Sequence, residues 1–284
     1  MNAADQCPAA VGTLRHITPD LVVRASGLVK SGEVVSLGRV VDHAVNDVSP
    51  GSVELQVTLE GDPPFAFGDQ LSIRCHGFAL THLDALGHVY RDGWVYGGSA
   101  AADLLGAHGL RHGDALELSG GIVTRGVLLD LTQVRQRPWL TPDDVITPAD
   151  LEAAERLARL TVGPGDAVMA YVGREAYERS AGWSPAAAQM CGLSSSAIPW
   201  LAERRVAVWA GECVEKLPSD DPELAMPLHM RGLPDLGLVI VDNPSLEGLA
   251  ARCRAYGRSE FLYICAGLRL RGATGCLVNP LAVF

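Results

Sequence analysis

Three of the chain's eight histidines and one aspartate lie within thirteen residues: His76, His82, Asp84 and His88. Neutral imidazole and carboxylate are the groups that hold Zn²⁺ or Mn²⁺, and gathering them beside apolar sequence is costly unless a cation compensates them. On an extended backbone alternate side chains share a face, and these four residues have the same parity. The segment therefore predicts a divalent metal site. The alternative is four separate polar side chains, each hydrogen-bonded locally.

The elements that must position this segment alternate between strand and helix without a linker. Residues 33–41 are β-rich, and residues 53–59 alternate apolar with polar side chains as a half-buried strand does. Residues 61–64 indicate a turn, and residues 71–75 lead as a strand into the histidines. The cluster is thus expected at a strand's end and in the following loop, where active sites are common.

Towards the C-terminus, the pattern predicts strands at 126–131, 167–172, 205–209, 236–241 and 261–266. Helices are expected at 148–160, 194–203 and 245–256. Thr147 and Pro148 provide an N-cap and a first helical residue, and Gly257 ends the last helix. Residues 272–280 form a glycine-rich tail. The pattern predicts one mixed α/β domain over residues 1–284, with 1–30 as an N-terminal extension.

Composition excludes two classes of partner. The chain has 284 residues, is 48% apolar and carries a formal charge of -10. A nucleic-acid partner is not expected, because phosphate binding needs concentrated Lys and Arg. No apolar run reaches membrane-spanning length, and the N-terminus lacks the pattern of a signal peptide. We therefore expect a cytoplasmic protein with no membrane partner.

The seven cysteines lack the Cys-x-x-Cys spacing of zinc knuckles, and they suggest no disulfide framework. Cys75 and Cys265 lie in apolar segments and are expected to be small buried hydrophobes, whereas Cys276 could lie nearer a pocket. A cysteine nucleophile is the weaker hypothesis, since nothing in the sequence supplies a dedicated base.

The residues from Thr81 to Tyr90, followed by Gly93 and residues 96–98, resemble the signature of a known family. This is the cyclase family of metal-dependent hydrolases, which includes bacterial kynurenine formamidase and isatin hydrolase. Longer members of the family are matched in order by residues 126–130, 198–201, 226–229, 241–243 and 272–284. The resemblance runs from about Val35 to Phe284. It implies an α/β fold of the swivelling β/β/α type.

The resemblance also implies roles for individual residues. His82 and Asp84 would bind a metal together with an upstream histidine, and His88 would be the general acid/base. His229 and Asp242 match the positions that complete the metal cluster where two ions are held, with Asp84 bridging. From the residues alone, His229 could lie in an ordinary loop, and Asp242 could cap a helix.

The chain departs from the family pattern at the first ligand. Family members usually carry a histidine four residues before the position of His82, but this chain has Phe78 there and His76 two residues earlier. Three outcomes follow: the loop rearranges so that His76 reaches the ion, the site depends on His229 and Asp242 instead, or no metal binds. Gly267 and residues 276–277 also replace Pro and Ser-Pro of the longer members.

Together these observations predict a metal-dependent hydrolase that opens a small cyclic or aryl amide, lactone or ester. Metal-activated water would attack, and His88 would transfer protons. One alternative is a biosynthetic cyclase or dehydratase of secondary metabolism, which forms a ring in a polyketide- or amino-acid-derived intermediate. A different class is a metal-free small-molecule binding protein. Nitrogen and oxygen ligands suit both Zn²⁺ and Mn²⁺. The resemblance implies a homodimer or tetramer.

Overall fold

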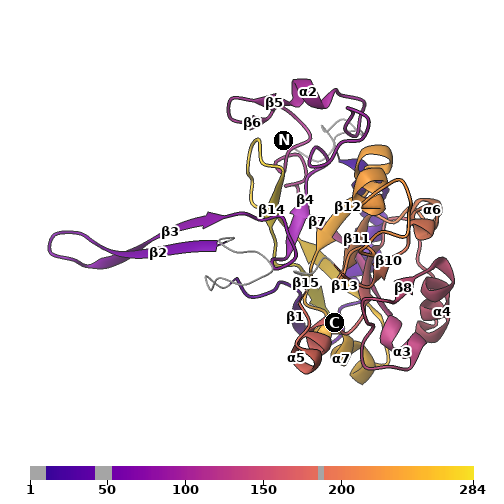
Figure 1. The fold of residues 1–284 in the computed structure, drawn as a ribbon. Helices are drawn as coiled ribbons and strands as arrows, with labels where there is room; N and C mark the ends of the chain where they lie inside the picture. Colours follow the sequence, from indigo (N-terminus) through magenta and orange to yellow (C-terminus); the bar gives the residue numbers. More distant parts are fainter. Residues whose placement is uncertain (1–10, 42–52, 185–188) are drawn as a thin grey trace.

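A nine-stranded mixed sheet forms the centre of the computed structural model, which describes residues 11–41, 53–184 and 189–284 (Figure 1). The strand order is β1-β15-β13-β7-β9-β11-β12-β4-β14. The four central strands are parallel: β7 (Ile122–Asp130), β9 (Ala167–Tyr171), β11 (Val208–Gly211) and β12 (Val239–Asp242). The flanking strands pair antiparallel: β4 (His82–Asp84) and β14 (Gly275–Leu277) beyond β12, and β13 (Glu260–Cys265), β15 (Leu281–Val283) and β1 (Val34–Ser36) beyond β7.

Helices supply the crossovers that parallel strands require. The connection from β7 to β9 contains α3 (Leu131–Arg135) and α4 (Pro148–Ala158). The connection from β9 to β11 contains α5 (Arg174–Ala181), η4 (Ser195–Ala197) and α6 (Ile198–Glu203). The connection from β11 to β12 contains the π-helix η5 (Leu228–Leu236). Helix α7 (Glu247–Tyr256) leads from β12 to β13. Near the N-terminus, η2 (Gly12–His16) precedes α1 (Pro19–Ser26), which packs on β7 and β13. Short elements complete the fold: α2 (Ala101–Leu104), β5 (Leu105–Gly106), β6 (Gly109–Leu110), β8 (Val145–Ile146) and β10 (Gly192–Leu193).

The central strands form the core, because helices and loops cover both of their faces. Every residue of β9 and β11 is buried, and their sequences are continuous apolar runs, as is typical of parallel strands covered on both sides. Trp209 and Tyr263 have no exposed surface. The predicted mixed α/β fold is confirmed.

Several helix boundaries follow the predicted local signals. Thr147 caps α4 in a reciprocal capping box with Asp150, and Pro148 is the first helical residue. The helix ends two residues before the predicted limit, because Arg159 adopts the left-handed conformation with φ of 54°. Gly257, with φ of 60°, ends α7 as predicted.

The predicted starts of two strands were wrong. The strands expected to begin at residues 205 and 236 begin at Val208 and Val239. The later start of β12 at Val239 follows because the helix η5 occupies residues 228–236. The glycine-rich tail contributes β14, which pairs with β4. Cys75 is only half-buried, whereas Cys265 and Cys276 are buried.

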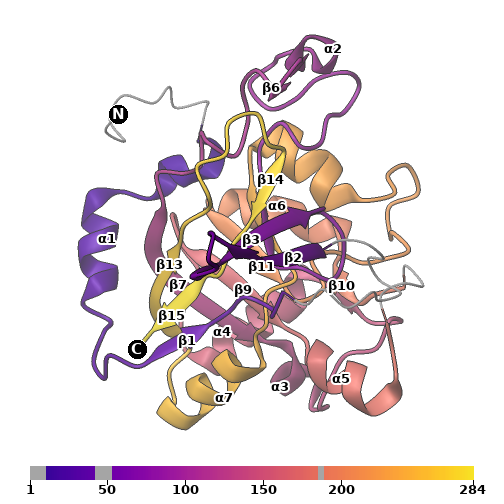
Figure 2. The ribbon, with the colours of Figure 1, turned by 90° about the vertical axis from the view of Figure 1, so that its left-hand side faces the viewer.

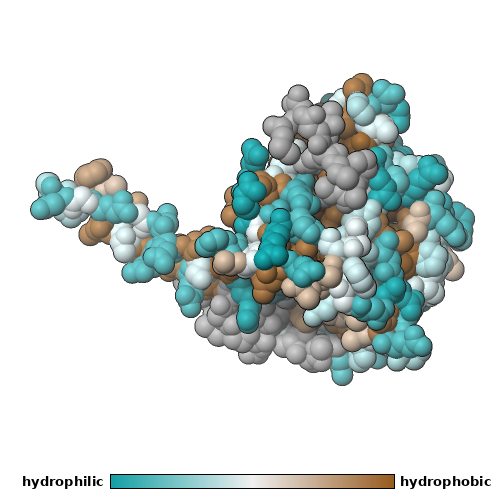
Figure 3. All heavy atoms as spheres, turned by 90° about the horizontal axis from the view of Figure 1, so that it is seen from above, coloured by the Kyte–Doolittle hydropathy of each residue, from teal (hydrophilic) through white to brown (hydrophobic). Residues whose placement is uncertain are grey.

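Strands β2 (Val53–Glu60) and β3 (Ala66–Ile73) pair along their full length and project away from the rest of the molecule (Figure 1). In Figure 2 they point towards the viewer. The space-filling view shows apolar and polar side chains along them (Figure 3). We call this hairpin, residues 53–73, the arm. The predicted strand and turn are present, but the expectation of a half-buried strand was wrong. In β2 only Val53 is buried.

Within the described parts of the chain, no helix combines the length and apolar character needed to cross a membrane.

Candidate metal centre

Strand register brings three of the predicted ligands onto one face of the sheet. Strand β4 lies between β12 and β14, and in its pairing with β12 His82 is opposite Asp242. Because side chains alternate along a strand, Asp84 shares the face of His82, while Leu83 points to the other side and is 1% exposed. The side chains of His82, Asp84 and Asp242 are all buried.

His229 approaches the same face from η5. Its Nε2 lies 3.4 Å from Asp84 Oδ2 and 3.4 Å from Asp242 Oδ2. Its other ring nitrogen, Nδ1, contacts the buried carboxylate of Glu215. Glu215 also accepts a hydrogen bond from the backbone N–H of Leu228, at 2.7 Å. Glu215 therefore orients the imidazole, as the outer partner of a metal-ligating histidine commonly does.

His76 and His88 lie on the accessible side of Asp84. His76 Nδ1 is 3.0 Å and His88 Nε2 is 3.9 Å from Asp84 Oδ1. The two imidazole rings stack with their centroids 3.6 Å apart, and His76 Nε2 lies 2.9 Å from the Thr274 hydroxyl. Both histidine side chains are about a quarter exposed, so a small molecule can approach from this side.

The loop before β4 is anchored so that His76 reaches the cluster. The Asn243 side chain donates to the carbonyl of Gly77 at 2.8 Å, and Arg174 donates to the carbonyl of Phe78 at 2.6 Å. Gly77 has φ of 136°, which favours glycine. The Phe78 side chain packs against the hydrophobic core. Of the three outcomes considered for the first ligand, this geometry supports the rearranged loop with His76.

The cluster offers two groups of donors that fit a divalent cation. His76, His82 and Asp84 each place one ligand atom within 4.8 Å of the others, and so do Asp84, His229 and Asp242. Both oxygens of Asp84 and Oδ1 of Asp242 are buried and accept no hydrogen bond. The polar atoms nearest the Asp84 oxygens are imidazole nitrogens of His76 and His229. A cation between these groups would compensate the buried carboxylate charge. The nitrogen and oxygen donors suit Zn²⁺ and Mn²⁺.

Burial and neighbouring charges shift the pKa values of Asp84, His229 and His88. Burial opposes ionisation of Asp84, but His229 and His76 hold the pKa of this carboxyl well below its usual range. Burial likewise disfavours the charged form of His229, yet the carboxylates of Asp242 and Asp84 raise its pKa well above the ordinary value. Burial lowers the pKa of His88 to about 4, so its imidazole is neutral at neutral pH. The protein alone therefore holds a proton on His229, which a bound cation would displace.

The structure brings together all six predicted site residues, and their roles as ligands and as acid/base remain predictions. The sequence reasoning missed Glu215, Thr274 and Asn243. The position of Glu215 in the sequence could have marked it as a site residue. It follows the C-terminal end of β11, and ligand sites form outside that end of parallel strands. Thr274 could not be found in this way, because it depends on the pairing of β14.

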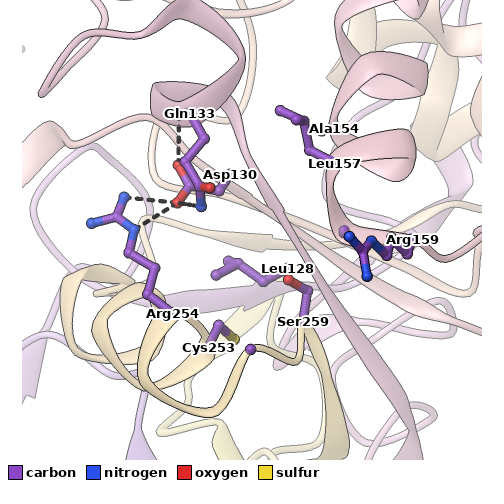
Figure 4. A pocket seen from close by; sticks show the side chains of 11 residues that line it. Leu128, Asp130, Gln133, Ala154, Leu157, Arg159, Cys253, Arg254 and Ser259 are labelled. Carbon is purple, nitrogen blue, oxygen red and sulfur yellow. Dashed lines mark hydrogen bonds and ion pairs between the residues drawn. The ribbon is translucent and has the colours of Figure 1, made fainter.

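A separate cavity of about 340 Å³ lies between α3, α4 and α7 (Figure 4). Its polar groups bind one another: Asp130 accepts two hydrogen bonds from the Arg254 side chain, at 3.0 and 2.7 Å, and one from the Gln133 side chain at 2.7 Å. Burial raises the pKa of the Cys253 thiol in its wall to about 12. This cavity therefore offers no activated nucleophile and no converging free ligands.

Comparisons with known proteins agree with this fold. A crystal structure described as a novel cyclase has 27% identity and a TM-score of 0.84, over 97% of this chain and 94% of that chain. Isatin hydrolase A from Labrenzia aggregata bound to benzyl benzoate has 17% identity and a TM-score of 0.63, over 91% of this chain and 94% of that chain. A potential metal-dependent hydrolase with cyclase activity has 17% identity and a TM-score of 0.54, over 88% and 96%.

Among proteins with curated functions, none matches this sequence. Residues 33–215 match the family model described as "Putative cyclase", and this segment contains four of the six site residues, His76, His82, Asp84 and His88. The match extends over more than half of the chain. This chain therefore belongs to the cyclase family.

Proposed function

We propose that this protein is a metal-dependent hydrolase that opens a small cyclic or aryl amide, lactone or ester. The observation that carries the proposal is the position of Asp84, whose two buried oxygens face imidazoles on opposite sides and accept no hydrogen bond. Held by this cluster, Zn²⁺ or Mn²⁺ would lower the pKa of water to about 7 and polarise a carbonyl group.

Residues of the chain would transfer protons and orient the ligands. His88 Nε2 points towards Asp84 and has an exposed edge, so it can take a proton from attacking water and pass it to a leaving nitrogen or oxygen. Its pKa of about 4 leaves the imidazole unprotonated at neutral pH, so that it is free to accept a proton at the start of the reaction. Glu215 holds Nδ1 of His229, which keeps Nε2 directed at Asp84 and Asp242.

Hydrolysis is preferred over the metal-free binder, because the carboxylate oxygens of Asp84 and Asp242 that are buried without a hydrogen bond match a cation better than an empty polar site. Ring closure is the second candidate. The family model is named for a cyclase, and the same acid/base and cation would serve a substrate that carries its own nucleophile.

A substrate panel tests the proposal. Protein reconstituted with Zn²⁺ or Mn²⁺ is incubated with isatin and other lactams, aryl formamides and aryl lactones, and ring opening is followed by absorbance. We expect hydrolysis of at least one class, abolished by chelation and restored by the metal. Ring closure of the corresponding open-chain compounds without hydrolysis would favour the cyclase. Ligand binding without turnover, unchanged by chelation, would contradict both enzymes.

A further inference from the structure

A small cavity of about 70 Å³ lies between η2, α6 and the end of η5. The described residues that line it are cationic or apolar, apart from one threonine: Arg15, His16 and Arg205; Leu201, Ala202, Val206, Leu236 and Leu238; and Thr13. None of them is acidic, and none belongs to the metal centre. The lining therefore matches a ligand that is anionic at one end and apolar at the other.

The cationic side chains at this cavity lack a counter-ion. Within residues 11–41, 53–184 and 189–284, the His16 ring and the Arg205 guanidinium form no hydrogen bond and no ion pair. Arg15 donates through Nη1 to the carbonyl of Gly12 and to the hydroxyl of Tyr96, both at 2.8 Å. Both acceptors are neutral, so the charge of Arg15 is not compensated, and its other guanidinium nitrogens are available as donors.

The electrostatic potential at the cavity is positive. Burial and the charges of Arg15 and Arg205 lower the pKa of His16, and no acidic side chain of the described chain opposes them. Asp235, at the end of η5, does not supply the missing charge, because it pairs with Arg91 at 2.9 Å. A neutral His16 still donates one hydrogen bond. An anion would thus meet two arginines and a further donor.

The size and layout of the cavity restrict the anion. A volume of about 70 Å³ equals that of roughly two water molecules in the liquid, so only a ligand of a few heavy atoms fits. Arg15 and Arg205 are exposed, whereas Leu201, Val206 and Leu238 are each 1% exposed. The charges therefore lie towards solvent and the apolar wall lies inside. Phosphate would place charged oxygens against that wall without donors, but a carboxylate with a short alkyl chain would not.

We propose that this cavity binds a short-chain aliphatic carboxylate of the size of propionate. The carboxylate accepts hydrogen bonds from the guanidinium groups of Arg15 and Arg205, whose planar donor geometry matches its two oxygens. The alkyl group contacts Leu201 and Leu238. This site is independent of the metal centre.

The first test is an NMR titration of the ¹⁵N-labelled full chain at constant ionic strength, with and without added Zn²⁺. Propionate binds with a dissociation constant on the order of 1 mM. Acetate binds about fourfold more weakly, because it lacks one methylene group, and inorganic phosphate also binds more weakly than propionate. The proposal is overturned by the absence of saturable binding, by phosphate that binds as tightly as propionate, or by binding that requires Zn²⁺.

The second test removes one cation without straining the backbone. Arg205 has φ of 53°, a conformation that favours glycine, so Arg205→Gly folds at least as stably as the wild type. It weakens propionate binding at least about tenfold, because a charged hydrogen-bond donor is lost. The matched control is Arg159→Gly, which makes the same change after α4 at φ of 54°, beside a different cavity. Equal affinities of the two variants would overturn the proposal.

The third test fills the cavity and leaves its charges unchanged. Ala202 is an exposed residue of α6, and leucine is also a good helix former, so Ala202→Leu preserves the helix. Propionate binding is lost in this variant, while thermal unfolding shows that the protein is folded. Unchanged affinity would show that the alkyl group lies elsewhere and would contradict the proposal. These tests need neither activity nor bound metal, so their outcome is separable from that of the proposed function.

Discussion

The imidazole rings of His76 and His88 lie face to face, with centroids 3.6 Å apart and planes inclined by 1°. Both rings point at Oδ1 of Asp84, at 3.0 and 3.9 Å, yet only His76 belongs to a group of converging ligand atoms. Burial, together with the neighbouring histidines, lowers the pKa of His88 to about 4 against the opposing charge of Asp84, whereas Asp84 and Cys75 raise the pKa of His76 to about 9 against burial. The stack therefore places a neutral, partly exposed imidazole beside the cluster, as a general base requires.

His88→Gln should lower kcat by about 10²–10⁴-fold, because general acid–base catalysis by one side chain contributes that much. Metal content should stay within error of the wild type, since His88 belongs to neither group of proposed ligands. Steady-state kinetics and elemental analysis of the same sample check both points. Full activity in the variant would show that His88 moves no proton.

His76→Ala should lose most of the metal held by the first ligand group, because one of its three donors disappears. Phe78→Leu is the matched control. It alters the position at which the family usually carries the histidine, but it keeps an apolar side chain against the core. Isothermal titration with Zn²⁺ and Mn²⁺ compares the two. Equal affinities of both variants would show that His76 is not a ligand.

Glu215→Gln should weaken metal affinity about 10–100-fold, because it removes the charge that orients His229 through Nδ1. Glu223→Gln makes the same change at an exposed residue and should leave the affinity unaltered. Titration of both variants under identical conditions measures the difference. If Glu215→Gln binds metal as tightly as the control, the contact with His229 has no role in the site.

Glu212→Gln tests a buried carboxyl outside the metal cluster. Burial raises the pKa of Glu212 to about 7 from 4.5, so the folded chain retains this proton more tightly than the unfolded chain. The resulting stabilisation is present below pH 4.5 and is lost as the pH rises to about 7, a change on the order of 3 kcal/mol. Gln keeps an acceptor for the backbone N–H groups of Val172 and Gly173.

The free energy of unfolding should therefore fall from pH 5 to pH 8 more in the wild type than in Glu212→Gln. Urea titrations at both pH values measure it, and taking the difference between the two proteins removes the contribution of other titrating groups. Parallel pH profiles would show that Glu212 does not titrate in this range.

Local signals predicted much of the fold and of the site. The capping residues of α4, the glycine after α7 and the apolar runs of β7 and β9 depend on nearby sequence, and they occur where expected. His82 and Asp84 could be placed together because strand alternation puts them on one face.

The remaining features depend on long-range pairing. The route of His76 into the cluster depends on Asn243 and Arg174, which lie far along the chain. The π-helix that presents His229 lies where the residues alone allowed an ordinary loop, and β12 begins three residues later than expected. The exposure of the arm could not be predicted, because alternation shows that a strand face is apolar but not which molecule covers it.

Metal stoichiometry after reconstitution tests the central claim most directly. Wild-type protein and Asp84→Asn are each incubated with Zn²⁺ or Mn²⁺, freed of excess ion and measured by elemental analysis, with thermal unfolding as the check that both are folded. Asp84 belongs to both ligand groups, so the wild type should retain one or two ions per chain and the variant close to none. A folded wild type that retains no ion, or a variant that retains as many as the wild type, would contradict the account.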